Sequence, residues 1–147
     1  VHAFIIGEHG DSELAVWSGA NVSGIPLERF CQFRGHNDHA GATQRIYEGV
    51  RDSAYEIIQR KGATYYGIAM AVARIAECIV KDQRSVLPVS VCLGGQYGLN
   101  GLCLSIPSIV GRRGVEQILE IPLNEAESSA LHASAKQLQE VIEHLNL

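Results

Sequence analysis

The sequence of 147 residues lacks several features that mark membrane proteins and nucleic-acid-binding proteins. It has no apolar run of the roughly 18 to 20 residues that span a bilayer, and its first residues form no basic-then-apolar targeting segment. Lysines and arginines are scattered, and the formal net charge is -4. These absences argue against a membrane partner and a nucleic-acid partner, so we expect small molecules and other protein subunits as partners.

Closely spaced cysteine pairs are also absent. Three of the four widely spaced cysteines lie in apolar stretches, and the four are Cys31, Cys78, Cys92 and Cys103. This pattern favours reduced core thiols in a cytoplasmic protein over a disulfide framework. Cys31, His36 and His39 lie near one another in the sequence, but without a Cys-x-x-Cys pair they are a weak metal pattern, and we expect no metal site.

No dinucleotide-binding Gly-x-Gly-x-x-Gly turn between a strand and a helix occurs. The glycines of residues 94–98 resemble a phosphate-binding loop only superficially, because no suitable helix follows, and we expect a hairpin turn. A chain of this length with 46% hydrophobic residues can form one domain around one core, over residues 1–147.

Hydrophobic periodicity predicts strands and helices along most of the chain. We expect strands over 1–6, 15–22, 86–93, 102–106 and 118–121, and helices over 44–62, 65–81 and from 124 onward. The late strands look like an antiparallel meander, and residues 35–43 are expected to be a mobile loop. The helix over 65–81 is apolar on most sides, which predicts a buried central helix. The predicted class is α+β.

The residues best suited to chemistry follow the first strand, in Gly7-Glu8-His9-Gly10-Asp11-Ser12. An imidazole transfers a proton near neutral pH, and the end of a strand presents it rigidly. Taken alone, His9 is equally well interpreted as a loop histidine that bonds to nearby backbone.

This motif resembles the active-site segment of the L-lactate dehydrogenase family. Two further segments agree, Lys61-Gly62-Ala63-Thr64-Tyr65-Tyr66-Gly67 and Leu87-Pro88-Val89-Ser90 followed by Gln96-Tyr97-Gly98. The resemblance covers the whole chain but only the C-terminal half of such an enzyme. It implies the family's C-terminal fold, with antiparallel strands packed against long helices, and it leads us to expect that the N-terminal dinucleotide-binding (Rossmann) domain is absent and that this chain is a fragment.

The resemblance also implies the roles of individual residues. Reduction of a small 2-keto acid such as pyruvate takes a hydride from NAD and a proton, and His9 would donate that proton or accept it from the 2-hydroxy acid. Thr64 would face the substrate, although it could simply cap a helix. Ile68 would pack against the nicotinamide ring, although alone it would be interpreted as a core residue. The aspartate and arginine that assist His9 in the family lie upstream of this chain.

Other implied properties concern regulation and substrate choice. His2 stands where bacterial family members activated by fructose 1,6-bisphosphate bind an effector phosphate at a subunit interface, and the complete enzyme is expected to be a homotetramer. Glu8 and Thr64 point to lactate rather than malate, and a 2-hydroxyisocaproate-type relative remains an alternative.

A different class of function is also open. Without a nucleotide-binding turn or a carboxylate clamp, this chain by itself is interpreted as a non-catalytic folding or oligomerisation module, and it is expected to be inactive alone. Its exposed faces would then cause self-association.

Overall fold

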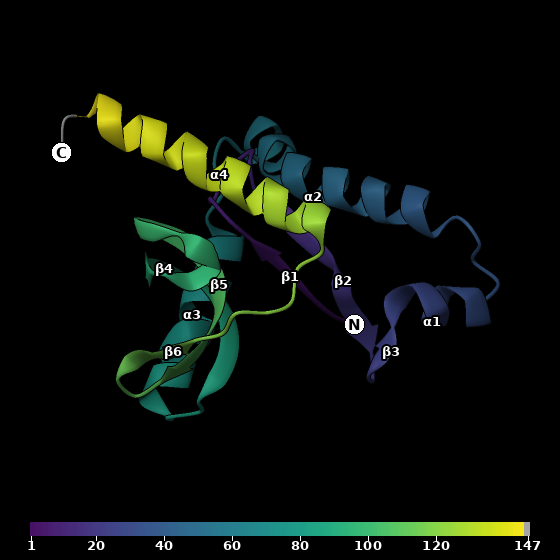
Figure 1. The fold of residues 1–147 in the computed structure, drawn as a ribbon, viewed down its shortest axis with the longest axis horizontal. Helices are drawn as coiled ribbons and strands as arrows, with labels where there is room; N and C mark the ends of the chain where they lie inside the picture. The colour runs from purple at the N-terminus through teal and green to yellow at the C-terminus, as the bar shows by residue number, and fades with distance from the viewer. Residues whose placement is uncertain (146–147) are drawn as a thin grey trace.

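The computed structural model describes residues 1–145 and arranges them as two antiparallel sheets with four helices around them (Figure 1). The first sheet has the order β1-β2-β3 and the second β4-β5-β6. A bridge between Gly7 and Ser105 joins the two sheets. The strands are β1 His2–Ile6, β2 Leu14–Val22, β3 Ile25–Pro26, β4 Ser85–Gly94, β5 Asn100–Gly111 and β6 Gly114–Ile118.

The helices are α1 Leu27–Phe33, α2 His39–Lys61, α3 Tyr66–Val80 and α4 Glu125–His144, with a 3-10 turn η1 over Gln96–Gly98. In Figure 1, α4 crosses above the second sheet, while α3 lies behind the strands of that sheet. The α+β class expected from the sequence is therefore confirmed, as is the antiparallel meander of the late strands β4, β5 and β6.

The hydrophobic core lies between α4 and the two sheets. Alternate residues of the strands point into it, as the period of two along a strand requires, and α4 adds Leu131 and Ala135 on one stripe. The buried members from the strands and turns are Ile6, Leu14, Val16, Val91, Leu93, Leu99, Leu102, Leu104 and Ile106. This core fixes the end of β1, where the candidate site begins.

The start of α4 and the end of α2 follow their sequence signals. The Asn124 side chain accepts a hydrogen bond from the Glu127 backbone N–H, and the Glu127 carboxylate accepts one from the Asn124 backbone N–H, so the expected capping box is confirmed. Gly62 ends α2 in the left-handed conformation at φ 79°, as predicted. However, α2 begins at His39, inside the stretch predicted to be a loop, because the Asp38 carboxylate accepts from Gly41 N at 3.0 Å and caps the helix early.

Two further predictions about the strands and loops need correction. Helix α1, which directly follows Pro26, was not predicted from the sequence. The strand predicted over 118–121 is in fact β6, Gly114–Ile118. The reason is the tight turn at Arg112-Arg113, which pairs Gly111 with Gly114 and starts the strand at once.

The prediction that residues 65–81 form a buried central helix is wrong for the described chain. Only Cys78 of α3 is buried, whereas Ile68, Met70, Val72 and Val80 are between 57% and 77% exposed. An apolar helix is buried only when other elements cover all its sides, and here β5 is the strand with which α3 makes its main contact. The chain therefore presents an open apolar helix surface.

The cysteine prediction is correct in part. All four thiols are free, and Cys78 is buried as expected of a core thiol. Cys92 and Cys103 are exposed, so they are not core residues. Their strands alternate between the two faces of the sheet, and these two side chains lie on the face turned away from the core.

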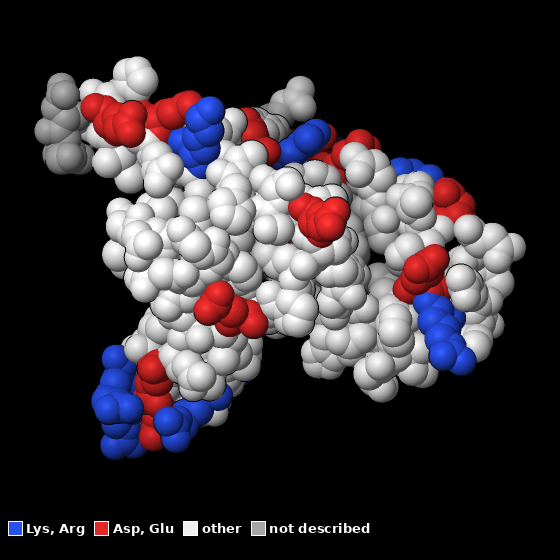
Figure 2. All heavy atoms as spheres, viewed as in Figure 1, with Lys and Arg blue, Asp and Glu red and all other residues white. Residues whose placement is uncertain are grey.

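In Figure 2, charged side chains lie along the upper edge of the molecule and at its lower tip, and the surface between them carries few. At one end of the second sheet, Arg84 and Arg113 from the adjoining turns approach the Glu116 carboxylate of β6 at 2.8 and 3.6 Å. None of the helices within residues 1–145 is long and apolar enough to cross a membrane.

Candidate functional site

The loop of residues 7–12 leaves β1 in a direction that its glycine sets. Gly7 has φ 101°, a conformation that side chains disfavour, and it exchanges two hydrogen bonds with Ser105 of β5, at 3.0 and 2.8 Å. A Cβ atom on Gly7 would come within 2.9 Å of Ser134 Oγ and 3.2 Å of a Leu14 methyl group. Glycine is therefore required here both by the backbone and by the space around it.

Helix α4 holds the first half of this loop. The backbone N–H of Glu8 donates to Ser134 Oγ at 2.8 Å, and the Ser12 hydroxyl donates to the Glu8 carboxylate at 2.7 Å. Ser12 and Ser134 also share a hydrogen bond at 3.2 Å. Ser134 is only 1% exposed, so its end of this network is shielded from water, whereas Glu8 and Ser12 are half-buried.

Helix α2 holds the second half of the loop. The Tyr55 hydroxyl donates to Asp11 Oδ1 at 2.9 Å, and the Tyr47 hydroxyl donates to the backbone oxygen of Glu13. The bond to Asp11 raises the pKa of Tyr55 from its ordinary value, and desolvation followed by the Glu13 charge raises the pKa of Tyr47. Both phenols therefore stay protonated and remain donors at neutral pH.

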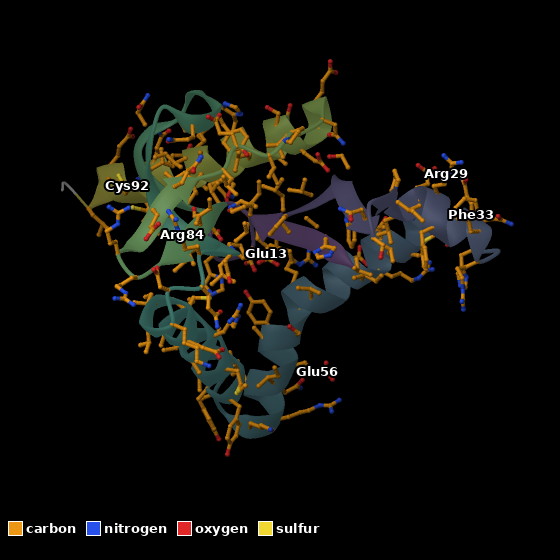
Figure 3. The ribbon with its side chains drawn as sticks, turned by 90° about the horizontal axis from the view of Figure 1, so that it is seen from below. Glu13, Arg29, Phe33, Glu56, Arg84 and Cys92 are labelled. Carbon is orange, nitrogen blue, oxygen red and sulfur yellow. The ribbon has the colours of Figure 1, made fainter. Side chains whose placement is uncertain are left out.

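His9 lies between these two anchored halves. It is exposed, and its ring forms no hydrogen bond with any residue in the described range 1–145. The loop around it is acidic, since Glu8, Asp11 and Glu13 are close. Desolvation raises the pKa of Glu13, the positive field of His9 opposes that shift, and Glu8 adds to it. Figure 3 shows Glu13 at the centre of the molecule, close to α2. A fixed backbone with a free imidazole is a suitable arrangement for proton transfer.

Thr64 and Ile68 lie on a different segment. Thr64 belongs to the short linker between α2 and α3, and α3 begins at Tyr66 with Tyr65 as the capping residue, so Thr64 does not cap the helix. Both side chains are exposed, Ile68 by 57%. No hydrogen bond between described residues connects either of them to the loop that carries His9. The structure thus leaves the three residues open to solvent and does not close a pocket around them.

The remaining predicted position, His2, is exposed near the start of β1, where it is paired with Asn21 of β2. It is separate from the loop of His9 and lies at the other end of the same strand. Among residues 1–145, no group of three or more His, Cys, Asp or Glu side chains is arranged to hold a metal ion.

The glycine-rich turn between β4 and β5 is a hairpin connection, as predicted. Its N–H groups are used inside the molecule: Gly94 N donates to Gln96 Oε1 at 2.8 Å, and Gly95 N donates to Leu99 O at 2.9 Å. Tyr97 N donates to the Glu120 carboxylate at 3.0 Å. A phosphate would find these donors occupied and a carboxylate beside them, so this turn is not a nucleotide-binding loop.

The residues that hold the loop of residues 7–12 in place were not predicted from the sequence. Ser134 is a polar residue on the apolar stripe of α4, three positions after Leu131. A hydroxyl at a buried position indicates a hydrogen-bond partner, and this was the signal in the sequence that could have identified Ser134. The two tyrosines of α2 gave no comparable signal, because their partners lie far away in the sequence.

Comparison with known proteins places this arrangement in a family. Residues 1–146 match the family model described as lactate/malate dehydrogenase, alpha/beta C-terminal domain. An L-lactate dehydrogenase from Acetivibrio thermocellus is 50% identical over 147 residues, which is 100% of this chain and 46% of the relative. One from Streptococcus thermophilus is 51% identical over 143 residues, or 97% of this chain and 43% of the relative.

Solved structures agree with the sequence relatives. A lactate dehydrogenase enzyme from a Medee basin deep-sea metagenome library has a TM-score of 0.95 at 39% identity, and the match covers 99% of this chain and 46% of that one. The minor L-lactate dehydrogenase from Enterococcus mundtii, in its ligands-bound form, has a TM-score of 0.90 at 38% identity, with 97% and 45% covered. The chain spans a little under half the length of these relatives.

Proposed function

The chain belongs to the lactate/malate dehydrogenase family as its alpha/beta C-terminal domain, and on this basis we propose that it is the proton-transferring half of an NAD-dependent L-lactate dehydrogenase. The observation that carries the proposal is the loop of residues 7–12. Both of its halves are hydrogen-bonded to helices, whereas the ring of His9 is left free.

The proposed chemistry divides between the cofactor and this chain. NAD, when bound, supplies or accepts the hydride. The protonated ring of His9 donates a proton to the carbonyl oxygen of pyruvate, and in the reverse direction the neutral ring takes the proton from the hydroxyl of L-lactate. Thr64 contacts the 2-position substituent of the substrate with its methyl and hydroxyl groups.

The described residues fit only part of NAD. Ile68 offers an open apolar side chain, 57% exposed, against which a flat nicotinamide ring can pack. In the glycine turn after β4, the N–H groups of Gly94, Gly95 and Tyr97 already have partners inside the molecule, and the Glu120 carboxylate beside them disfavours a pyrophosphate. We therefore propose that this chain contacts the nicotinamide end of the cofactor and that another part of the enzyme binds the rest.

The exposed apolar surface of α3 supports the proposal that another protein segment packs against this chain. Met70, Val72 and Val80 are 58% to 77% exposed, which is unfavourable in water and typical of a surface that another protein segment covers. The chain covers 46% of a relative that is 50% identical to it. We propose that the remaining part of the enzyme covers this surface, and that the complete enzyme is a cytoplasmic homotetramer.

His2 is proposed as an effector contact. Its exposed position on β1 leaves the imidazole accessible to a phosphate group of fructose 1,6-bisphosphate. This role is separable from catalysis, because His2 and His9 lie at opposite ends of the strand. Activation by the bisphosphate that is lost in His2→Gln, with the unstimulated rate unchanged, would support it.

The test uses a chimera in which the preceding residues of the Acetivibrio thermocellus L-lactate dehydrogenase are joined to Val1 of this chain. We expect the chimera to oxidise NADH with pyruvate and the 147-residue chain alone to be inactive. His9→Ala in the chimera should lower kcat by about 10²- to 10⁴-fold, the usual contribution of a positioned general acid.

The matched control is His36→Ala, because His36 is an exposed histidine outside the loop of residues 7–12. It should leave the rate unchanged. Full activity in the His9→Ala chimera would show that the role of His9 is wrong. Faster turnover with oxaloacetate or with 2-ketoisocaproate than with pyruvate would replace lactate by malate or 2-hydroxyisocaproate as the substrate.

A further inference from the structure

Two cysteines face each other directly across the second sheet. Strands β4 and β5 pair without interruption from Ser85 with Val110 to Cys92 with Cys103. Both thiols are free and exposed. Figure 3 shows Cys92 at the periphery of the molecule, on β4.

The type of pairing at this position follows from two prolines. Pro88 lies opposite Pro107 in the same register, and neither can donate a backbone hydrogen bond to the other strand. That pair therefore occupies a non-hydrogen-bonded position. Such positions alternate along an antiparallel ladder, and Cys92 lies four residues from Pro88, so the cysteine pair is non-hydrogen-bonded too.

The other side of β5 confirms this alternation. Ser105 exchanges its backbone hydrogen bonds with Gly7, and Pro107 O accepts one from Leu119 N at 2.8 Å. The backbone N–H and C=O groups of residues 105 and 107 therefore point away from β4. The same holds for Cys103, which lies two residues before Ser105.

Non-hydrogen-bonded pairs have Cα atoms roughly 4.5 Å apart, and disulfides occur at Cα separations of roughly 4.4 to 6.8 Å. The backbone thus already has a spacing that a disulfide can bridge.

We propose that Cys92 and Cys103 are a site of reversible oxidation, forming a cross-strand disulfide with a small-molecule disulfide as the oxidant. One thiolate attacks a sulfur of the oxidant, forms a mixed disulfide and releases one small thiolate. The second cysteine then attacks the protein sulfur of the mixed disulfide, releasing the second small thiol. The two protein thiols lose two electrons and two protons, and the oxidant is reduced to two thiols.

The other two cysteines do not compete for this reaction. Cys78 is buried in α3, and Cys31 lies on α1, which packs against the first sheet rather than the second. The pair in the second sheet is also the one whose separation is fixed by paired strands. The site is therefore specific to Cys92 and Cys103.

The environment of Cys103 predicts how the rate depends on pH. Desolvation, together with the neighbouring Cys92, raises the pKa of the Cys103 thiol above its ordinary value of 9.0. A raised pKa keeps the thiol protonated at neutral pH, and the thiolate is the attacking species. We expect the attack by Cys103 to accelerate as the pH rises, because more of its thiol is then deprotonated.

The test is incubation of the folded chain with glutathione disulfide, followed by intact-mass measurement and peptide mapping. The chain should lose the mass of two hydrogen atoms, and the peptides that contain Cys92 and Cys103 should be linked. Reduction with dithiothreitol should restore the original mass. The double variant Cys31→Ser/Cys78→Ser should behave identically.

Single variants separate this site from general thiol reactivity. Cys92→Ser and Cys103→Ser should not lose two hydrogens and should instead retain one glutathione on the remaining thiol. Loss of two hydrogens in Cys92→Ser, glutathione on both cysteines of the original chain, or no reaction at all would each overturn the proposal. None of these outcomes depends on the dehydrogenase function.

Discussion

Gly7 determines how the loop with His9 leaves the first sheet. Its positive φ of 101° and the 2.9 Å approach of Ser134 Oγ to a Cβ position both act against any side chain. We expect Gly7→Ala to lower the free energy of unfolding by about 2 to 3 kcal/mol, from left-handed strain plus the steric contact. Urea unfolding followed by circular dichroism measures the change.

Gly24→Ala is the matched control for this substitution. Gly24 also has a positive φ, 81°, but no atom lies within 4 Å of its Cβ position. Backbone strain alone should cost about 1 kcal/mol there. If the two substitutions destabilised the chain equally, Ser134 would not be the close neighbour that holds the loop.

At the residue scale, the sequence predicted His9 but did not predict Ser134 and Tyr55, which hydrogen-bond to the loop that carries it. His9 stood out because an imidazole between glycines follows a strand. Ser134 and Tyr55 lie more than forty residues away from the loop residues they bind, with separations of 126 and 44 residues. Local patterns carry no information on such contacts, because they depend on how the helices pack.

At the scale of elements, Glu127 connects α4 to the first sheet. Its carboxylate accepts hydrogen bonds from Ser18 N at 2.9 Å, from the Ser18 hydroxyl and from Asn124 N at 3.0 Å. An amide at this position has a single acceptor oxygen, which leaves a donor without a partner. We expect Glu127→Gln to destabilise the chain by about 1 to 3 kcal/mol in urea unfolding at pH 7.

The same substitution should change the pH dependence of stability. Desolvation alone would raise the pKa of Glu127, but the hydrogen bonds from Ser18, Asn124 and Trp17 outweigh it and lower the pKa below the ordinary value of 4.5. A lowered folded-state pKa stabilises the fold above pH 4.5, and this contribution is lost as the pH falls through the folded value. The original chain should therefore lose stability on acidification more steeply than Glu127→Gln.

Glu125→Gln is the control, since Glu125 is an exposed residue in the same first turn of α4. Its acid profile should follow that of the original chain. A Glu127→Gln profile that stays parallel to that of the original chain as the pH falls below about 4.5 would contradict the lowered pKa of Glu127.

The ends of helices that carry a local capping residue were predicted well. The ends of elements that depend on pairing with another strand were not. The capping box of Asn124 and the stop at Gly62 act within one turn, so the sequence contains the whole signal. The start of β6 depends on pairing with β5 across the Arg112-Arg113 turn, and that register cannot be obtained from the strand's own residues.

At the scale of the whole molecule, the mispredicted burial of α3 has a physical explanation. The apolar composition of the helix predicts that it prefers burial, and this is a property of the residues. Whether a neighbour is available is a property of everything around the helix, and within residues 1–145 its apolar side chains are largely exposed. The sequence thus predicted the preference of the helix correctly and its surroundings incorrectly.

The exposed side chains of α3 predict that this chain associates with itself when it is alone in solution. Met70 and Val72, exposed by 73% and 58%, would be removed from water in the associated form, and burial of apolar surface is favourable by about 25 cal/mol per Å². We expect sedimentation velocity at rising concentration to show a mass above that of one chain. Met70→Glu and Val72→Glu should restore the single-chain mass, because glutamate supports a helix but resists burial.

Val141→Glu tests whether any exposed apolar residue would give the same result. Val141 is 55% exposed on α4, so it matches Val72 in exposure but lies on another helix. It should leave the association unchanged. A chain that stays single at all concentrations, or one that Val141→Glu dissociates as well as Val72→Glu does, would show that α3 is not the associating surface. If the prediction holds, addition of the N-terminal part of a relative as a separate chain should compete with self-association, since both would cover the same helix.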